Sequence, residues 1–145
     1  GGREKAPAAI CRKIALAKIH NKDIIEVWGN GEQRRSFTFI EDCLRGTDLL
    51  MKSDIREPLN IGSSELVSIN DLVDLVAHIA GVKVRKKYIL DAPQGVQGRN
   101  SDNTKIQEYF NWEPSTKLKD GLEITFKWVY DQIKNPNSPK KFRQF

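Results

Sequence analysis

Arginine and glutamine residues follow a glycine turn in one segment, and together they could bind a phosphate-bearing ligand. The segment Gly29–Asp42 reads GNGEQRRSFTFIED. In the expected strand, alternation puts Gln33 and Arg35 on one face, with Arg34 between them. A guanidinium can grip a diphosphate through two parallel hydrogen bonds. The alternative is an ordinary hairpin that carries surface charges.

A second cationic segment, Gly98-Arg99-Asn100-Ser101-Asp102, precedes an expected helix. The N-terminus of a helix offers unpaired N–H groups and a positive dipole end, so Arg99 stands where an anion is favoured. An ordinary capped helix with a loop arginine would give the same pattern.

Lys5 lies just before a helix that we expect to begin at Pro7. A lysine at such a position can exchange protons with a bound substrate and serve as an acid or base. A surface lysine with no chemical role remains the simpler reading of this residue alone.

The elements that must position these side chains alternate between helix and strand, which predicts an α/β fold. Apolar spacing and turn residues predict helices over 7–20, 41–52, 68–81, 101–110 and from Asp120 onward. They predict strands over 24–28, 35–40, 58–62 and 82–90, with 91–100 a loop. The first two strands should form a hairpin around Gly29-Asn30-Gly31.

The composition limits which classes of protein the chain can belong to. The chain has 145 residues, a net charge of +5 and no apolar run near the roughly 20 residues that span a membrane. Two cysteines, Cys11 and Cys43, suggest a reduced, cytoplasmic setting, and no Cys/His spacing suits a metal. Because the chain begins at Gly1 and its only methionine is Met51, we expect a piece of a longer protein.

A dinucleotide-binding loop is not expected in this chain. Such a loop reads G-x-G-x-x-G between a strand and a helix. Here Gly29 and Gly31 are followed by Arg34 in the third glycine position, and strands are expected on both sides. We therefore predict no cofactor-binding residue in this chain.

Several short motifs occur in a fixed order along most of the chain. They are Gly29, Gly31, Gln33, Arg35 and Phe37; Asn60-Ile61-Gly62-Ser63; Arg99 and Asp102; Asn111-Trp112-Glu113-Pro114; and Asp120-Gly121-Leu122. In this order they resemble the C-terminal half of extended short-chain dehydrogenase/reductase enzymes that act on nucleotide sugars.

The resemblance implies a substrate-binding portion over 1–134 and a flexible basic tail over 135–145, with the N-terminal Rossmann domain missing. NAD would be bound mainly by that missing half. The resemblance assigns Lys5 as the catalytic residue of this chain. It assigns substrate binding to Glu4, Lys5, Ala6, Lys13, Gln33, Arg34, Arg35 and Arg99.

Ser36, the opening GGREKAPAAICRK and the run 98–103 narrow the resemblance to a branch that acts on GDP-mannose. For that branch, oxidation at C4, inversion at C3 and C5, and re-reduction would give GDP-L-galactose. Lys5 would return protons to the ring. The catalytic cysteine would belong to the missing half, which leaves Cys11 as a core residue. The intact enzyme would be a homodimer, and this portion alone would be inactive.

Two other readings stay open. The chain could belong to a nucleotide-sugar 4-epimerase or 4,6-dehydratase of the same family, although Ser36 and Lys5 favour the first reading. It could instead be a non-enzymatic module that binds nucleotide or nucleic acid. No recognition-helix or aromatic-rich basic pattern supports that module, so we expect neither nucleic acid nor membrane as a partner.

Overall fold

The computed structural model describes residues 4–93 and 95–135 of the chain. The described part alternates helices and strands, and the expected α/β class is confirmed. In chain order the elements are α1 (Ala6–Ile19), β1 (Ile24–Trp28), β2 (Arg34–Arg35), α2 (Ile40–Met51), β3 (Val67–Ser68), α3 (Ile69–Ala80), β4 (Arg85–Ile89), β5 (Gly98–Arg99), α4 (Thr104–Phe110) and α5 (Leu118–Lys134).

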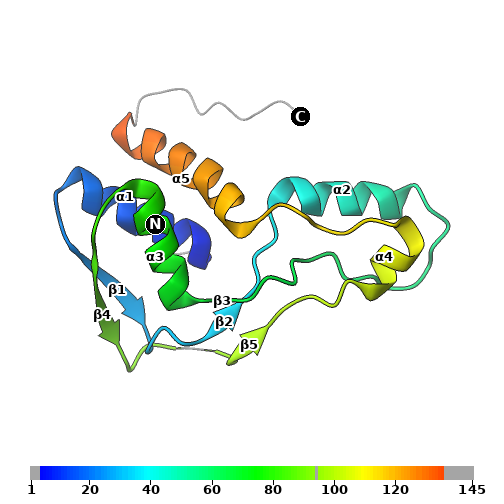
Figure 1. Ribbon diagram of the computed structural model, residues 1–145, viewed down its shortest axis with the longest axis horizontal. Helices are drawn as coiled ribbons and strands as arrows, with labels where there is room; N and C mark the ends of the chain where they lie inside the picture. The colour runs from blue at the N-terminus through cyan, green and yellow to red at the C-terminus, as the bar shows by residue number, and fades with distance from the viewer. Residues whose placement is uncertain (1–3, 94, 136–145) are drawn as a thin grey trace.

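The main hydrophobic core lies among α1, α3 and α5, with β1 and β4 along one side (Figure 1). Ile14, Leu72 and Val76 are fully buried there. The stripe of Leu122 and Phe126 brings α5 onto the same core. The two strands are parallel, and Ile25 and Val27 of β1 point inward. Burial of these apolar side chains is the main force that holds this end of the molecule together.

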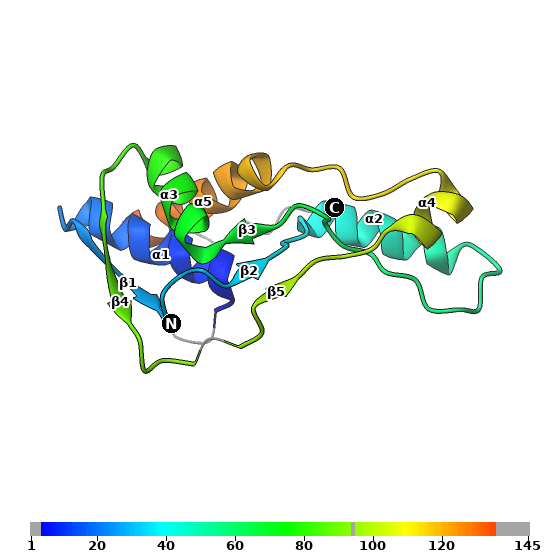
Figure 2. The same ribbon diagram turned by 60° about the horizontal axis from the view of Figure 1, so that its bottom comes forward.

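A small three-stranded sheet connects this core to the rest of the chain. Its order is β3-β2-β5, with β2 antiparallel to β3 and parallel to β5. Figure 2 shows these short strands between the β1–β4 pair at one end and α2 with α4 at the other.

The far end is held by contacts between α2, α4 and the loops beside them. Ile106 of α4 is fully buried. The buried Asp42 carboxylate accepts the Thr116 N–H at 2.9 Å, and Asn103 Nδ2 donates to the Gly62 carbonyl at 2.8 Å. Gly46 of α2 faces Ile61 and Trp112 so closely that a side chain there would meet both.

Local signals in the sequence place most helices correctly. Ser68 caps α3 by accepting the Asp71 N–H at 3.0 Å, and Gly81 ends it with a φ of 66°. The prediction for α5 is late by two residues. Glu65, which comes from a distant segment, accepts the Leu118 N–H at 3.0 Å and so lets the helix begin at Leu118.

The predicted hairpin is wrong. β1 pairs with β4 rather than with the following strand, and β2 covers only two residues. The turn between them has left-handed glycines, with φ of 69° at Gly29 and 76° at Gly31, and it turns the chain away from β1.

Two further strand predictions need correction. The segment 58–62 is not a strand, because its polar groups bond to side chains such as Asn103 instead of to a ladder. The expected loop 91–100 contains β5, which pairs with β2.

Two further expectations concern the C-terminal tail and membrane-spanning helices. The basic tail predicted over 135–145 lies, apart from Asn135, outside the described residues. Within 4–93 and 95–135, no helix combines the length and apolar character needed to cross a membrane.

Gly46 provides a test of how tightly α2 is packed. In an open helix position, Gly46→Ala would stabilise the protein by about 1 kcal/mol through helix propensity. A Cβ here would lie 2.7 Å from Ile61 Cγ2 and 2.8 Å from the Trp112 ring. We therefore expect the free energy of unfolding to fall by about 1–3 kcal/mol in urea denaturation.

Thr47→Ala is the matched control for this test. Thr47 is the exposed neighbour on the same helix, and its hydroxyl donates only to the Cys43 carbonyl. Its substitution should change stability by no more than about 0.5 kcal/mol. A gain in stability in Gly46→Ala would contradict the packing of α2 against Trp112.

Candidate functional site

A groove of about 550 Å³ opens between the start of α1, the strand β1 and the segment that leads into β2. This volume lies within the usual range for small-molecule sites, roughly 300–1,000 Å³. Its lining combines apolar residues from α1 and α3 with a set of polar and charged side chains. The polar and charged members are Glu4, Lys5, Arg12, Lys13, Glu26, Gln33 and Arg35.

Six of the sequence-predicted site residues line this one groove: Glu4, Lys5, Ala6, Lys13, Gln33 and Arg35. Lys5 is the N-cap of α1, and Lys13 follows two turns later on the same helix. Gln33 and Arg35 come from the other wall, where alternation along the strand brings both to one side. Segments about 30 residues apart are thus brought together around one groove.

Arg99 does not line the groove but lies beside one of its walls. Strands β2 and β5 are parallel, and their register pairs Arg35 with Arg99. Paired residues on neighbouring strands project from the same face of a sheet. The two arginines are therefore paired across the strands on one face, and like charges at paired positions destabilise a sheet unless an anion lies between them.

Arg34 lines a different hollow. Its side chain belongs to the opposite face of β2, in a hollow of about 440 Å³ with Asn30, Gly95 and Gly98. Gln33 borders both hollows. A role for Arg34 in binding the same ligand stays a prediction.

The carboxylates of the groove are already paired with cations. Glu4 Oε1 lies 3.1 Å from Arg12 Nε, and Glu26 Oε1 lies 3.4 Å from Lys87 Nζ. Lys13 donates to the backbone carbonyl of Glu26 at 2.7 Å. In the described part of the chain, Lys5, Arg35 and Arg99 have no carboxylate partner. Positive charge without a partner on this side of the groove favours an anionic ligand.

Gln33 adds an uncharged acceptor to the groove. Its Nε2 donates to the Trp28 carbonyl at 3.1 Å. Its Oε1 is buried and has no donor among the described residues. Buried polar atoms are nearly always hydrogen-bonded, so this oxygen lacks the partner that such an atom usually has.

The groove is also lined by three residues that were not predicted from the sequence: Arg12, Glu26 and Trp28. Arg12 is seven residues after Lys5, a spacing that places both on one helix face. Glu26 and Trp28 alternate with the buried Ile25 and Val27. The helical spacing of Arg12 and the strand alternation of Glu26 and Trp28 would predict all three, provided that the face of each element toward the groove is known.

Cys11 lies in the core and not in the groove. It is fully buried, and burial raises its pKa to about 12. The thiolate is the reactive form of cysteine, so a thiol with this pKa is inert near neutral pH. This agrees with the prediction that Cys11 is a core residue.

Comparisons with known proteins agree with the motifs. A family model described as GDP-mannose 4,6 dehydratase matches residues 2–125. The chain is 50% identical over 133 residues to GDP-mannose 3,5-epimerase 1 of rice (Oryza sativa subsp. japonica) and to GDP-mannose 3,5-epimerase of Arabidopsis thaliana. Each match covers 92% of this chain and 34% of the relative, so the chain spans about a third of their length.

Solved structures show the same fold. UDP-glucose 4-epimerase of Thermotoga maritima matches with a TM-score of 0.80 and 24% identity, over 91% of this chain and 41% of that one. UDP-glucuronic acid 4-epimerase of Bacillus cereus matches with a TM-score of 0.73 and 30% identity, over 89% and 41%. The α/β arrangement found here is thus a recurring part of sugar-nucleotide epimerases.

The two cysteines should differ in their reaction with a thiol reagent. At pH 8, a pKa of about 12 leaves about one thiolate in ten thousand at Cys11. Cys43 is only half-buried. We expect the Cys43→Ser variant to stay unmodified when folded and to react at once in denaturant, whereas Cys11→Ser reacts while folded. Equal rates in the two folded variants would contradict the buried position of Cys11.

Proposed function

This chain belongs to the family described as GDP-mannose 4,6 dehydratase, and we propose that it is the substrate-binding portion of an NAD-dependent epimerase converting GDP-mannose to GDP-L-galactose. The observation that carries the proposal is the groove between α1 and β2, which collects Lys5, Lys13, Gln33 and Arg35. The 50% identity to GDP-mannose 3,5-epimerases supports this substrate over those of relatives that are 28–34% identical.

The diphosphate of the substrate would lie against Arg35 and Arg99. The two arginines are paired through the β2–β5 register, and neither has a carboxylate partner among the described residues. A bound diphosphate would relieve their mutual repulsion and accept charge-assisted hydrogen bonds from both. Lys13 and the unpaired Gln33 Oε1 would orient the remainder of the nucleotide.

Lys5 would move a proton at the sugar ring. It is exposed at the mouth of the groove, on the non-helical residue just before α1. The rigid helix that follows fixes its backbone, while the long side chain can reach a ring carbon. A positioned ammonium can give a proton to a carbon from which another group has removed one, and the two transfers together invert that carbon.

The glycine turn of this chain does not fit the pyrophosphate of NAD. The glycine turn after β1 leads into β2, not into a helix, so it offers no helix N-terminus to a pyrophosphate. When bound by the remainder of the intact protein, the cofactor would supply the hydride chemistry at C4. We infer that this portion alone binds substrate but does not turn it over.

Arg35→Ala and Arg99→Ala test the diphosphate site in the intact protein. Each removes charge-assisted hydrogen bonds worth about 1.5–3 kcal/mol, so the affinity for GDP-mannose should fall about tenfold or more. Calorimetric titration would measure it. Lys127→Ala, which removes an exposed charge on α5 away from the groove, should leave the affinity unchanged. Normal affinity in both arginine variants would defeat the assignment.

Lys5→Arg separates proton transfer from simple charge pairing. Arginine keeps the charge but stays protonated far above neutral pH, so it cannot return a proton to carbon. We expect near-normal GDP-mannose binding, with loss of inversion and of deuterium exchange from solvent into C3 and C5. Near-normal turnover in this variant would leave Lys5 as a binding residue only.

A further inference from the structure

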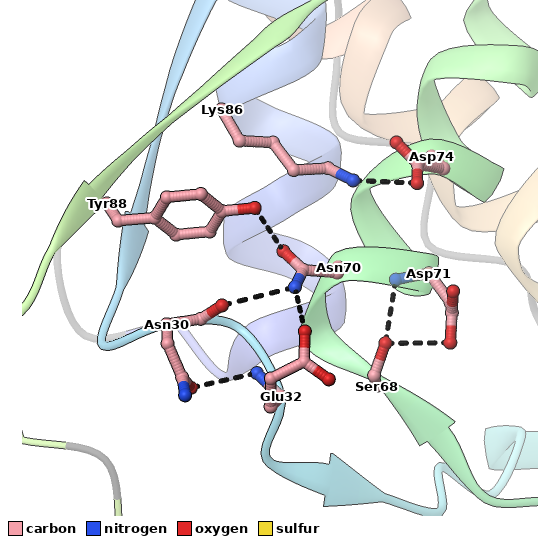
Figure 3. A network of polar contacts seen from close by, with 8 residues as sticks. All are labelled: Asn30, Glu32, Ser68, Asn70, Asp71, Asp74, Lys86 and Tyr88. Atoms are coloured by element: carbon pink, nitrogen blue, oxygen red, sulfur yellow. Dashed lines mark hydrogen bonds and ion pairs between the residues drawn. The ribbon is translucent and has the colours of Figure 1, made fainter.

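The side chain of Asn70, the second residue of α3, is hydrogen-bonded to three residues in two separate segments (Figure 3). Its Nδ2 donates to the Asn30 carbonyl at 3.1 Å and to Glu32 Oε1 at 2.8 Å. Its Oδ1 accepts the Tyr88 hydroxyl of β4 at 3.1 Å. One amide thus links the glycine turn, the start of α3 and the β1–β4 sheet.

These partners allow only one orientation of the amide. A backbone carbonyl and a carboxylate can only accept, so both need the NH₂ group of Asn70. The reversed amide would set its oxygen against two acceptors. No other side chain of similar size offers two donors and one acceptor in this arrangement, since Asp lacks the donors and Leu lacks all polar atoms.

The glycine turn fits closely around the same side chain. A Cβ on Gly31 would lie 2.2 Å from Asn70 Oδ1, so the backbone passes where only glycine can. The Asn70 N–H also donates to the Gly31 carbonyl at 3.0 Å. Asn70 therefore holds the turn through its backbone and its side chain together.

Two groove residues border this turn. Trp28 precedes it and Gln33 follows it, and the Gln33 side chain bonds to the Trp28 carbonyl. The Ile69 N–H donates to the Gln33 carbonyl at 3.2 Å. Any shift of the turn would move Gln33, and with it Arg35 two residues later.

We propose that Asn70 is a positioning residue for the substrate groove, which holds the turn at 29–32 so that Gln33 and Arg35 face the ligand. The proposal rests on the proposed function, because it takes the groove to bind a nucleoside diphosphate. Asn70 does not line the groove and acts only through the turn. Side chains that carry a ligand need this kind of support from the residues behind them.

The same helix supplies a matched control. Asp74, one turn after Asn70, pairs with Lys86 of β4 at 2.6 Å. This contact also fastens α3 to β4, but it does not touch the turn. A purely structural role for Asn70 would make the two positions equivalent in their effect on ligand binding.

The test measures GDP binding by calorimetry and thermal unfolding in the intact protein, for Asn70→Leu and Asp74→Asn. We expect both variants to unfold at lower temperature. Only Asn70→Leu should weaken GDP binding, by about tenfold, because a displaced turn misaligns Gln33 and Arg35. Unchanged GDP affinity in Asn70→Leu, or an equal loss in Asp74→Asn, would overturn the proposal.

A pair of substitutions at Asn70 and Glu32 tests the hydrogen-bond geometry further. Asn70→Asp would face its carboxylate with that of Glu32 and weaken GDP binding. Glu32→Gln on that background supplies an NH₂ donor and should restore most of the affinity, as a double-mutant cycle would reveal. Absence of this rescue would count against the proposal.

Tyr88→Phe keeps the test decisive if Asn70→Leu does not fold. It removes only the hydroxyl that orients the amide, at a residue that is 44% exposed. GDP binding should weaken about twofold, in line with one neutral hydrogen bond. Normal binding in both Tyr88→Phe and Asn70→Asp would overturn the positioning role.

Arg35→Ala separates this proposal from the proposed function. Loss of GDP affinity in Arg35→Ala, with normal affinity in the Asn70 variants, would overturn only the positioning role. Equal GDP binding by wild type, Arg35→Ala and Arg99→Ala would overturn the proposed site itself.

Discussion

The first N–H groups of α3 need hydrogen-bond acceptors, and the way they find them shapes the rest of the structure. Ile69 and Asn70 donate to the carbonyls of Gln33 and Gly31, and Asp71 donates to Ser68 Oγ. One of these acceptors lies in the turn after β1, and another lies on Gln33, the residue that follows the turn. The helix start therefore fastens that turn to the core, and through it sets where β2 and its arginines lie.

A groove with uneven charge follows from this arrangement. The start of α1 provides one wall with Lys5, and the fastened turn provides the other with Gln33 and Arg35. Glu4 and Glu26 are matched by Arg12 and Lys87, so they do not neutralise the remaining cations. Parallel pairing of β2 with β5 then adds Arg99. Such a set of cations is stable beside a ligand that carries several negative charges.

The start of α1 separates a buried side chain, Cys11, from an exposed one, Lys5. Cys11 is enclosed among Ile10, Ile14 and neighbouring core residues, where burial keeps it a neutral thiol. Lys5, six residues earlier, stands outside the helix at the groove mouth. Position relative to the start of α1 thus decides which of the two side chains is exposed and which is buried. Under the proposed function, this portion would supply binding and orientation, while a cofactor would supply the redox chemistry.

Local chemistry written in the sequence determined the helices, because caps and apolar periodicity act over a few residues. Ser68 and Gly81 cap the two ends of α3, and the helical spacing of Ile10, Cys11 and Ile14 indicates α1. The ordered motifs also identified the family and six residues of the groove. Strand partners were decided only by tertiary structure: β1 joins β4 across about 60 residues, and β2 joins β3 and β5. These pairings bring Arg99 beside Arg35 and Tyr88 to Asn70, and they depend on contacts between distant segments that no local pattern records.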